Sequence, residues 1–184
     1  MHNLEGEQIA LVPFEEKHLN DPQYLMWLRD YDVIKTINRA DYLRPVSFFE
    51  VKEYCEAVQR SPTDMFLAII ERDGDRFIGT LRVSQLNWRT RTADIGILIG
   101  ERDSWGKGIG TDAISTICSF LFGRLGIRRL TAGLMGVNPG MQKVFERLGF
   151  VQEGVFRGHD LFEGEYVDHI YLGCMESEFE PIRG

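Results

Sequence analysis

The chain has 184 residues, of which 43% are apolar, and both values are typical of one globular domain, so we expect a single domain spanning residues 1–184. The formal net charge of −7 argues against a nucleic-acid binder and favours a cationic or amine partner, although an acidic surface also simply aids solubility. The three cysteines are widely spaced in apolar contexts, and no signal pattern or membrane-length apolar run is present. We therefore expect reduced thiols, no metal site, no membrane association and a cytoplasmic protein.

The N-terminal third of the sequence predicts a strand followed by helices. Residues Gln8–Pro13 form a short apolar run of the kind found in strands. Asp21 and Pro22 supply the N-cap and the first residue of a helix, whose apolar stripe would contain Leu25, Trp27, Leu28 and Tyr31. Ser47 and Glu50 form a capping box, which predicts a second helix.

Three consecutive strands lead to the centre of the chain. The run Met65–Glu71 is almost continuously apolar, as in a strand buried on both faces. Asp73 and Gly74 predict a hairpin turn, after which Phe77–Gln85 returns antiparallel. A further turn leads into a third strand that begins near Asp94.

The stretch from Ile95 to Ala113 places a glycine-rich loop between a strand and a helix. Isoleucines alternate along the strand, and apolar residues from Ile109 onward recur at helical spacing. Between them lies the loop Gly106–Gly110, which contains Lys107. Because the first N–H groups of a helix have no partner within it, this loop predicts a site for a phosphate or pyrophosphate.

Two common phosphate-binding motifs do not fit this loop. A dinucleotide fingerprint requires a glycine where the chain has Thr111. A P-loop requires GxxxxGK before Ser or Thr, whereas here the preceding glycine is one residue too far away and Gly108 follows the lysine. The sequence therefore argues against a plain nucleotide-binding domain.

The loop instead resembles the acetyl-CoA loop of the GCN5-related N-acetyltransferases (GNAT), written (Q/R)xxGx(G/A). Trp105 stands at the Gln/Arg position, and Gly108 and Gly110 match the two small residues. The tryptophan departs from the general pattern, but WGKG is similar to a variant of the ribosomal-protein N-acetyltransferase branch.

Two later segments carry the same resemblance. The segment Asn138–Phe150 reads as a capped helix and resembles the second cofactor motif of the family, an asparagine followed by the ending LGF. The phrase EGVFRG, with Asp168 and Tyr171 downstream in a terminal hairpin, is similar to the ribosomal-protein branch. His159 and His169 of that hairpin receive no role. The resemblance covers nearly the whole chain.

The resemblance implies a GNAT fold, an α/β architecture with a mixed, mostly antiparallel sheet of about seven strands, flanked by helices and splayed beside the central strand. It implies acetyl-CoA as donor, with its pyrophosphate held by the loop, its pantetheine arm paired along the strand edge and its thioester oxygen near the N–H of Ile99 or Gly100. The residues assigned to the cofactor are Leu98, Ile99, Gly100, Trp105, Gly106, Lys107, Gly108, Ile109, Gly110, Thr111, Asn138 and Phe145.

Proton handling departs from the family pattern. Many members have a tyrosine that protonates the leaving thiolate where this chain has Phe145, and often a serine at the position of Met141. A thiol with a reference pKa of about 8.5 leaves without much help, so Phe145 is expected only to pack against the pantetheine.

The acceptor ammonium must lose a proton, and the resemblance implies an acidic residue on the central strand for this step. Asp94 is the candidate catalytic base. Six residues of strand put it roughly 20 Å from Gly100, so it would act through water. A solvated structural carboxylate is the alternative interpretation.

In the family, the first helix and the loop after it line the acceptor site, which implies Trp27, Tyr31 and residues 36–43 near the substrate. The expected acceptor is a protein N-terminus or a small primary amine. A nucleotide-linked amino sugar of surface-polysaccharide synthesis is the alternative. A non-catalytic acyl-CoA sensor is a second alternative, because Phe145 and Met141 donate no proton. The sequence leaves monomer or homodimer open.

Overall fold

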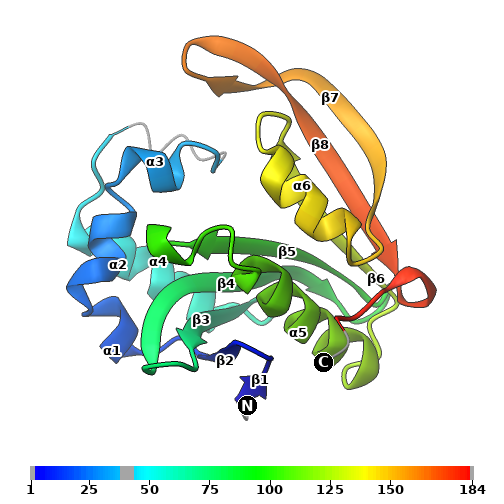
Figure 1. Cartoon of the computed structure of the whole chain (residues 1–184), viewed down its shortest axis with the longest axis horizontal. Helices are drawn as coiled ribbons and strands as arrows, with labels where there is room; N and C mark the ends of the chain where they lie inside the picture. Colours follow the sequence, from blue (N-terminus) through cyan, green and yellow to red (C-terminus); the bar gives the residue numbers. More distant parts are fainter. Residues whose placement is uncertain (1–2, 38–43, 183–184) are drawn as a thin grey trace.

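An eight-stranded sheet organises the computed structural model, which describes residues 3–37 and 44–182 (Figure 1). The strand order is β1-β2-β3-β4-β5-β6-β8-β7. The strands are β1 Leu4–Glu5, β2 Ile9–Pro13, β3 Met65–Glu71, β4 Arg76–Asn87, β5 Thr92–Ile99, β6 Arg129–Met135, β7 Val151–Phe162 and β8 Glu165–Met175. Only β5 and β6 pair in parallel, which confirms the mixed, mostly antiparallel sheet. The strand beyond the seven expected is the two-residue β1 at one edge.

Helices cover both faces of this sheet. One apolar core contains side chains of α5 (Ile109–Gly123) and α6 (Pro139–Glu146). The other contains side chains of α1 (Glu16–Leu19), α2 (Pro22–Trp27), α3 (Tyr31–Ile34) and α4 (Phe48–Arg60). Short 3-10 turns occur at η2 (Arg102–Ser104) and η3 (Glu176–Glu178). Within the described residues, no helix is both long and apolar enough to cross a membrane.

The helix expected to run through Tyr31 is in fact two helices. The N-cap at Asp21 is confirmed, since its carboxylate accepts from the Gln23 N–H at 2.9 Å, but α2 ends at Trp27. Asp30 then accepts from the Asp32 N–H at 3.0 Å and begins α3. A single continuous helix was the wrong prediction because the side chain of Asp30 competes for backbone N–H groups and favours a new N-terminus.

The central strand β5 divides its side chains between the two cores. Ile95 is buried in the core on the α5 side, and Ile97 and Ile99 pack against the same core. Leu98 packs on the opposite face, against the α1–α4 core. This alternation places Asp94 and Gly96 on the α1–α4 face as well.

The expected splay beside the central strand is confirmed by the short pairing between β5 and β6. Their partners are Thr92 with Arg129, Ala93 with Leu130, and Asp94 with Thr131. Both strands continue beyond these pairs, β5 to Ile99 and β6 to Met135, without further pairing to each other. The sheet therefore opens in a V whose narrow end lies at Asp94.

The wide end of the V is fixed by a tight contact at Gly100. A Cβ atom built on Gly100 would lie 2.0 Å from Cδ2 of Trp27, so only glycine leaves room for the indole. Trp27 is 4% exposed. The first helical segment therefore packs directly onto the backbone where β5 ends.

Gly100→Ala is expected to lower the free energy of unfolding by about 1–3 kcal/mol, because the added methyl group overlaps a buried ring. Gly96→Ala, within β5, is the matched control, since a Cβ there meets no atom within 4 Å. That variant should be neutral or stabilised by up to about 1 kcal/mol. Urea unfolding of both variants measures the difference, and equal effects would contradict the packing of Trp27 on Gly100.

Candidate active site

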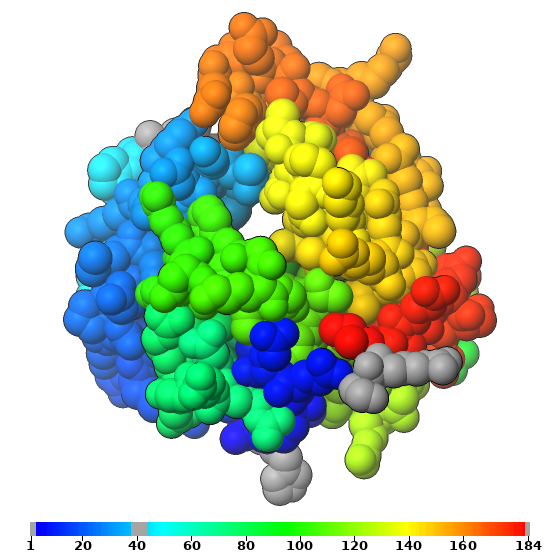
Figure 2. All heavy atoms as spheres, in the orientation of Figure 1, coloured from blue at the N-terminus to red at the C-terminus, as the bar shows by residue number. Residues whose placement is uncertain are grey.

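The divergence of β5 from β6 opens a hollow through the molecule. Figure 2 shows it bordered by the blue α2–α3 segment, the green segment after β5 and the yellow α6, with the orange β7–β8 hairpin above. Two side-chain contacts link its sides. The Tyr31 hydroxyl donates to Glu163 Oε1 at 3.3 Å, and Asn138 Nδ2 donates to Thr36 Oγ1 at 3.3 Å. These two contacts close the hollow on one side. On the other side it is bordered by the part of β5 that is not paired with β6.

The open edge of β5 presents backbone groups of alternate residues to this hollow. The Gly100 N–H donates to the Ile78 carbonyl at 2.9 Å, so Gly100 faces β4. Hydrogen-bonded pairs alternate in an antiparallel ladder, so Leu98 also faces β4. Ile97 and Ile99 therefore direct their backbone groups toward the side from which β6 has diverged.

This geometry narrows two of the backbone assignments. Of the two N–H groups expected near the thioester oxygen, that of Gly100 is already bonded to Ile78, which leaves the N–H of Ile99 as the prediction. The backbone of Leu98 is likewise turned to its β4 partner Thr80. The exposed edge that can pair with an extended amide chain consists of Ile97 and Ile99.

Trp105 fixes the far end of this edge. Its indole Nε1 donates to the Ile99 carbonyl at 2.9 Å, while the ring remains 44% exposed. The tryptophan at the family's Gln/Arg position therefore turns back onto the end of β5. This contact leaves the N–H of Ile99 and both backbone groups of Ile97 directed to the hollow.

The loop after Trp105 exposes the N-terminus of α5. Gly106 and Gly108 have φ values of +73° and +85°, which favour glycine. Gly108 is the N-cap residue and caps no N–H with a side chain, so the N–H groups of the first turn remain available. A Cβ on Gly106 would meet nothing within 4 Å. These residues, with the nearby Lys107, fit a pyrophosphate such as that of acetyl-CoA.

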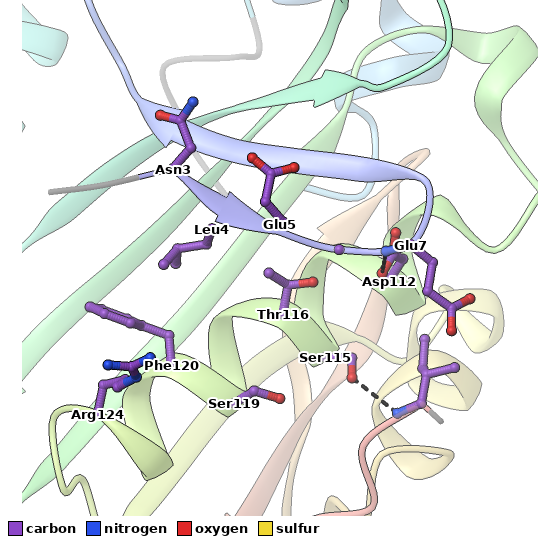
Figure 3. Close-up of a pocket in the computed structure, with 12 residues that line it drawn as sticks. Asn3, Leu4, Glu5, Glu7, Asp112, Ser115, Thr116, Ser119, Phe120 and Arg124 are labelled. Carbon is purple, nitrogen blue, oxygen red and sulfur yellow. Dashed lines mark hydrogen bonds between the residues drawn. The ribbon is translucent and has the colours of Figure 1, made fainter. Parts of the chain in front are cut away.

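Asp112, which the sequence did not single out, anchors the start of α5. Its buried carboxylate accepts from the backbone N–H groups of Gln8 at 2.7 Å, Glu7 at 3.0 Å and Ile9 at 3.1 Å. Figure 3 shows the contact between Asp112 and Glu7 beside a cavity of about 540 Å³ between β1 and α5. None of the residues assigned to the cofactor is among those that line this cavity.

The second cofactor motif forms the helix as expected, but one of its side chains is placed differently. Asn138 caps α6 by accepting from the Met141 N–H at 3.2 Å. Phe145 is 3% exposed, and its ring contacts Phe150 at 4.9 Å in the core. The expected packing of Phe145 against the pantetheine is therefore replaced by core packing. The flexible Met141 lies nearer the loop, 4.0 Å from a Cβ built on Gly110.

The two residues expected near the acceptor occupy different environments. Trp27 is buried, and its Nε1 donates to Glu101 Oε1 at 3.1 Å. It therefore affects the hollow indirectly, by positioning Glu101. The Arg76 guanidinium forms ion pairs in the same region, with the carboxylates of Asp103 at 3.0 Å and Glu101 at 3.5 Å. Tyr31 is exposed at the rim. Of the expected loop 36–43, residues 38–43 lie outside the described residues.

Asp94 lies at the narrow end of the V. Thr131 Oγ1 donates to its carboxylate at 2.8 Å. Burial raises the pKa of Asp94 above its ordinary value, although the Thr131 hydrogen bond and the charge of Arg82 act in the opposite direction. Pairing between β5 and β6 ends at Asp94, so Asp94 lies where the unpaired edge of β5 begins.

A further polar pair, which was not predicted from the sequence, lies on the same face of the sheet as Asp94. His169 Nδ1 lies 2.7 Å from Asp160 Oδ2, across β8 and β7. Its strand neighbours Ile170 and Leu172 are buried in the α5-side core, so alternation places His169 on the Asp94 side of the sheet. The only sequence signal was a histidine in a hairpin, which does not reveal such a partner.

Comparisons with known proteins agree with this geometry. A family model described as an acetyltransferase (GNAT) domain matches residues 8–151. A probable N-acetyltransferase of Bacillus subtilis, YjcK, is 31% identical over 184 residues, covering 96% of this chain and 99% of that protein. YdaF of the same organism, named as a candidate ribosomal N-acetyltransferase, is 29% identical over 102 residues, which is 55% of each chain.

The fold is also that of solved acetyltransferases. The structure of spermidine N-acetyltransferase from Vibrio cholerae, in complex with CoA and spermine, superposes with a TM-score of 0.81. It covers 93% of this chain and 97% of that one at 20% sequence identity. Together with the family model and the loop geometry, these similarities show that the chain belongs to the GNAT family of acetyl-CoA-dependent N-acetyltransferases.

Proposed function

We propose that this enzyme acetylates a primary amine on a small molecule or a peptide N-terminus by direct attack of the amine on the acetyl donor. The observation that supports this most is the open edge of β5, which joins the α5 loop at one end to Asp94 at the other. When bound, acetyl-CoA supplies the activated acetyl group. The residues of this chain bind the donor, align it with the amine and form the acceptor site.

On the donor side, the backbone does most of the binding. The first-turn N–H groups from Gly108 to Thr111, aided by Lys107, are suited to the pyrophosphate. Ile97 and Ile99 are suited to pair with the amides of the pantetheine arm as an added strand would. Asn138 positions α6 against the other side of the hollow through its contact with Thr36.

On the acceptor side, the charges favour a cation. Asp94 lies at the floor, Glu163 lies at the rim beside Tyr31, and the chain has a net charge of −7. An ammonium group is attracted to such a site, whereas the phosphates of a nucleotide-linked sugar are repelled. The spermidine enzyme of similar fold supports a small amine, and the similarity to YdaF keeps peptide N-termini among the candidates.

Asp94 has a defined part in this proposal. An alkylammonium with a reference pKa of about 10.4 is mostly protonated at neutral pH and must lose a proton before it attacks. The carboxylate of Asp94 attracts the ammonium and accepts its proton through a bridging water. Met141 and Phe145 take no part in proton transfer, because the thiol is a good leaving group.

The decisive experiment measures thiol release from acetyl-CoA by the purified protein with polyamines, N-terminal peptides and nucleotide-linked amino sugars. We expect saturable release with polyamines or with peptides, and little with the amino sugars. Saturation by an amino sugar alone would overturn the charge argument. Binding of acetyl-CoA by folded protein without release for any amine would instead favour the non-catalytic sensor.

Asp94→Asn is expected to lower kcat by roughly 100-fold or more, because the amide accepts no proton but keeps the Thr131 hydrogen bond. In the wild type, kcat should fall at low pH as the carboxylate is protonated at a pKa above its usual range, and the variant should lack this dependence.

Stability separates this role from a structural one. A raised carboxyl pKa means that the ionised form destabilises the fold once the pH exceeds the ordinary carboxyl range. At pH 7 the Asn variant should therefore be no less stable in urea than the wild type. Asp73→Asn, in an exposed turn, controls for the loss of one charge. A stable Asp94→Asn variant with full activity would refute the assigned role.

Trp105→Phe should raise the KM for acetyl-CoA by about 3- to 10-fold, because it removes one hydrogen bond that fixes the end of β5. Trp88→Phe is the matched control, since Trp88 is 57% exposed in a turn away from the loop. Steady-state kinetics with acetyl-CoA as the varied substrate measure both. An unchanged KM in Trp105→Phe would show that the indole contact does not organise the donor site.

A further inference from the structure

The pair formed by His169 and Asp160 has the geometry of an oriented imidazole. Asp160 is 1% exposed, and its Oδ2 lies 2.7 Å from His169 Nδ1. A buried carboxylate in this position accepts the Nδ1 proton of a neutral ring, which leaves the lone pair on Nε2. The pair therefore presents a base at Nε2 and holds it in one tautomer.

The Nε2 atom lies over β6, the strand next to β5. A Cβ built on Gly133 would lie 2.6 Å from Nε2, so the ring rests over the bare backbone of this glycine. Gly133 follows Thr131, the partner of Asp94, by two residues, a separation of about 7 Å along a strand. A single water spans most of such a gap. His169 is also close enough for its charge to influence the pKa of Asp94.

The surroundings of His169 suit a residue that exchanges protons with solvent. The groups that face it are Asp160 and His159 from β7, Tyr171 from its own strand and Asp94 from β5, while the β6 residues beside it, Gly133 and Met135, are uncharged. Its side chain is 12% exposed, so a proton on the ring has access to water.

We propose that His169, oriented by Asp160, is the proton relay of the acceptor site and carries the proton of the acceptor ammonium from Asp94 to bulk water. This inference rests on the proposed function. For each acetyl group transferred the nitrogen of the ammonium loses two protons: one ends on the departing thiolate, which becomes the thiol of CoA, and the other, lost before the attack, takes the route proposed here. It passes through water to Asp94, then to Nε2 of His169 and from there to solvent, so that Asp94 is restored for the next cycle.

The test begins with wild-type protein and an amine that it acetylates. His169→Asn keeps an amide donor for Asp160 but has no titratable base, and it should lower kcat by roughly 10- to 100-fold with little change in the KM of the amine. His159→Asn is the matched control on the neighbouring strand and should stay within twofold of the wild type. His169→Ala should regain activity with added imidazole but not with pyrazole, which has the same shape and is a far weaker base.

Asp160→Asn gives an independent measurement that leaves the histidine in place. Its amide donates to Nδ1 and so puts the proton on Nε2, which should lower kcat about 10-fold or more. Full activity of His169→Asn or Asp160→Asn, or equal rescue of His169→Ala by imidazole and pyrazole, would overturn the relay. Absence of amine acetylation by the wild type would instead contradict the proposed function. That outcome differs from failure of the relay, in which the wild type is active and the variants are equally active.

Discussion

The early divergence of β6 from β5 is the constraint on which the rest of the structure depends. Pairing stops after Asp94 and Thr131, and the outward-facing backbone groups of Ile97 and Ile99 then lack a neighbouring strand. Unpaired backbone polar groups are costly when buried, so such an edge needs water or another partner. The indole N–H of Trp105 donates to one of these groups, the Ile99 carbonyl. The remaining groups form a row that could pair with an extended chain of amides, which is the basis of the proposed donor site.

An open edge is useful only if its ends are held in place. Trp27 packs on Gly100 and donates to Glu101, which also meets Arg76, so the end of β5 is tied to both α2 and β4. At the start of α5, the carboxylate of Asp112 accepts hydrogen bonds from three backbone N–H groups of the N-terminal segment. These contacts lie outside the hollow. They give the loop between Glu101 and Asp112 a defined position before any ligand arrives.

The sequence predicted most of the fold because its signals are local. The caps at Asp21, Ser47 and Asn138 and the glycines of the α5 loop each specify a nearby turn or helix end, and all lie where expected. The missed features depend on distant partners. The inward turn of Phe145 is decided by Phe150 and the core, which no spacing rule specifies. A break in the β7–β8 register between Phe156 and Asp160 accompanies the pairing of Asp160 with His169, and the sequence carries no local signal for it.

In the function proposed above, the three directions available to the side chains and backbone groups of β5 keep the donor and the acceptor apart. Side chains of Ile95, Ile97 and Ile99 point to the α5 core, and backbone groups of the last two point into the gap beside β6. The remaining direction, toward the α1–α4 face, carries Asp94, beside which Thr131 and His169 also lie. Neutral hydrogen-bonding groups therefore face the proposed donor site, while titratable groups lie on the α1–α4 face. Because an anionic pyrophosphate and a cationic amine require opposite fields, this separation along a single strand lets one narrow hollow hold both.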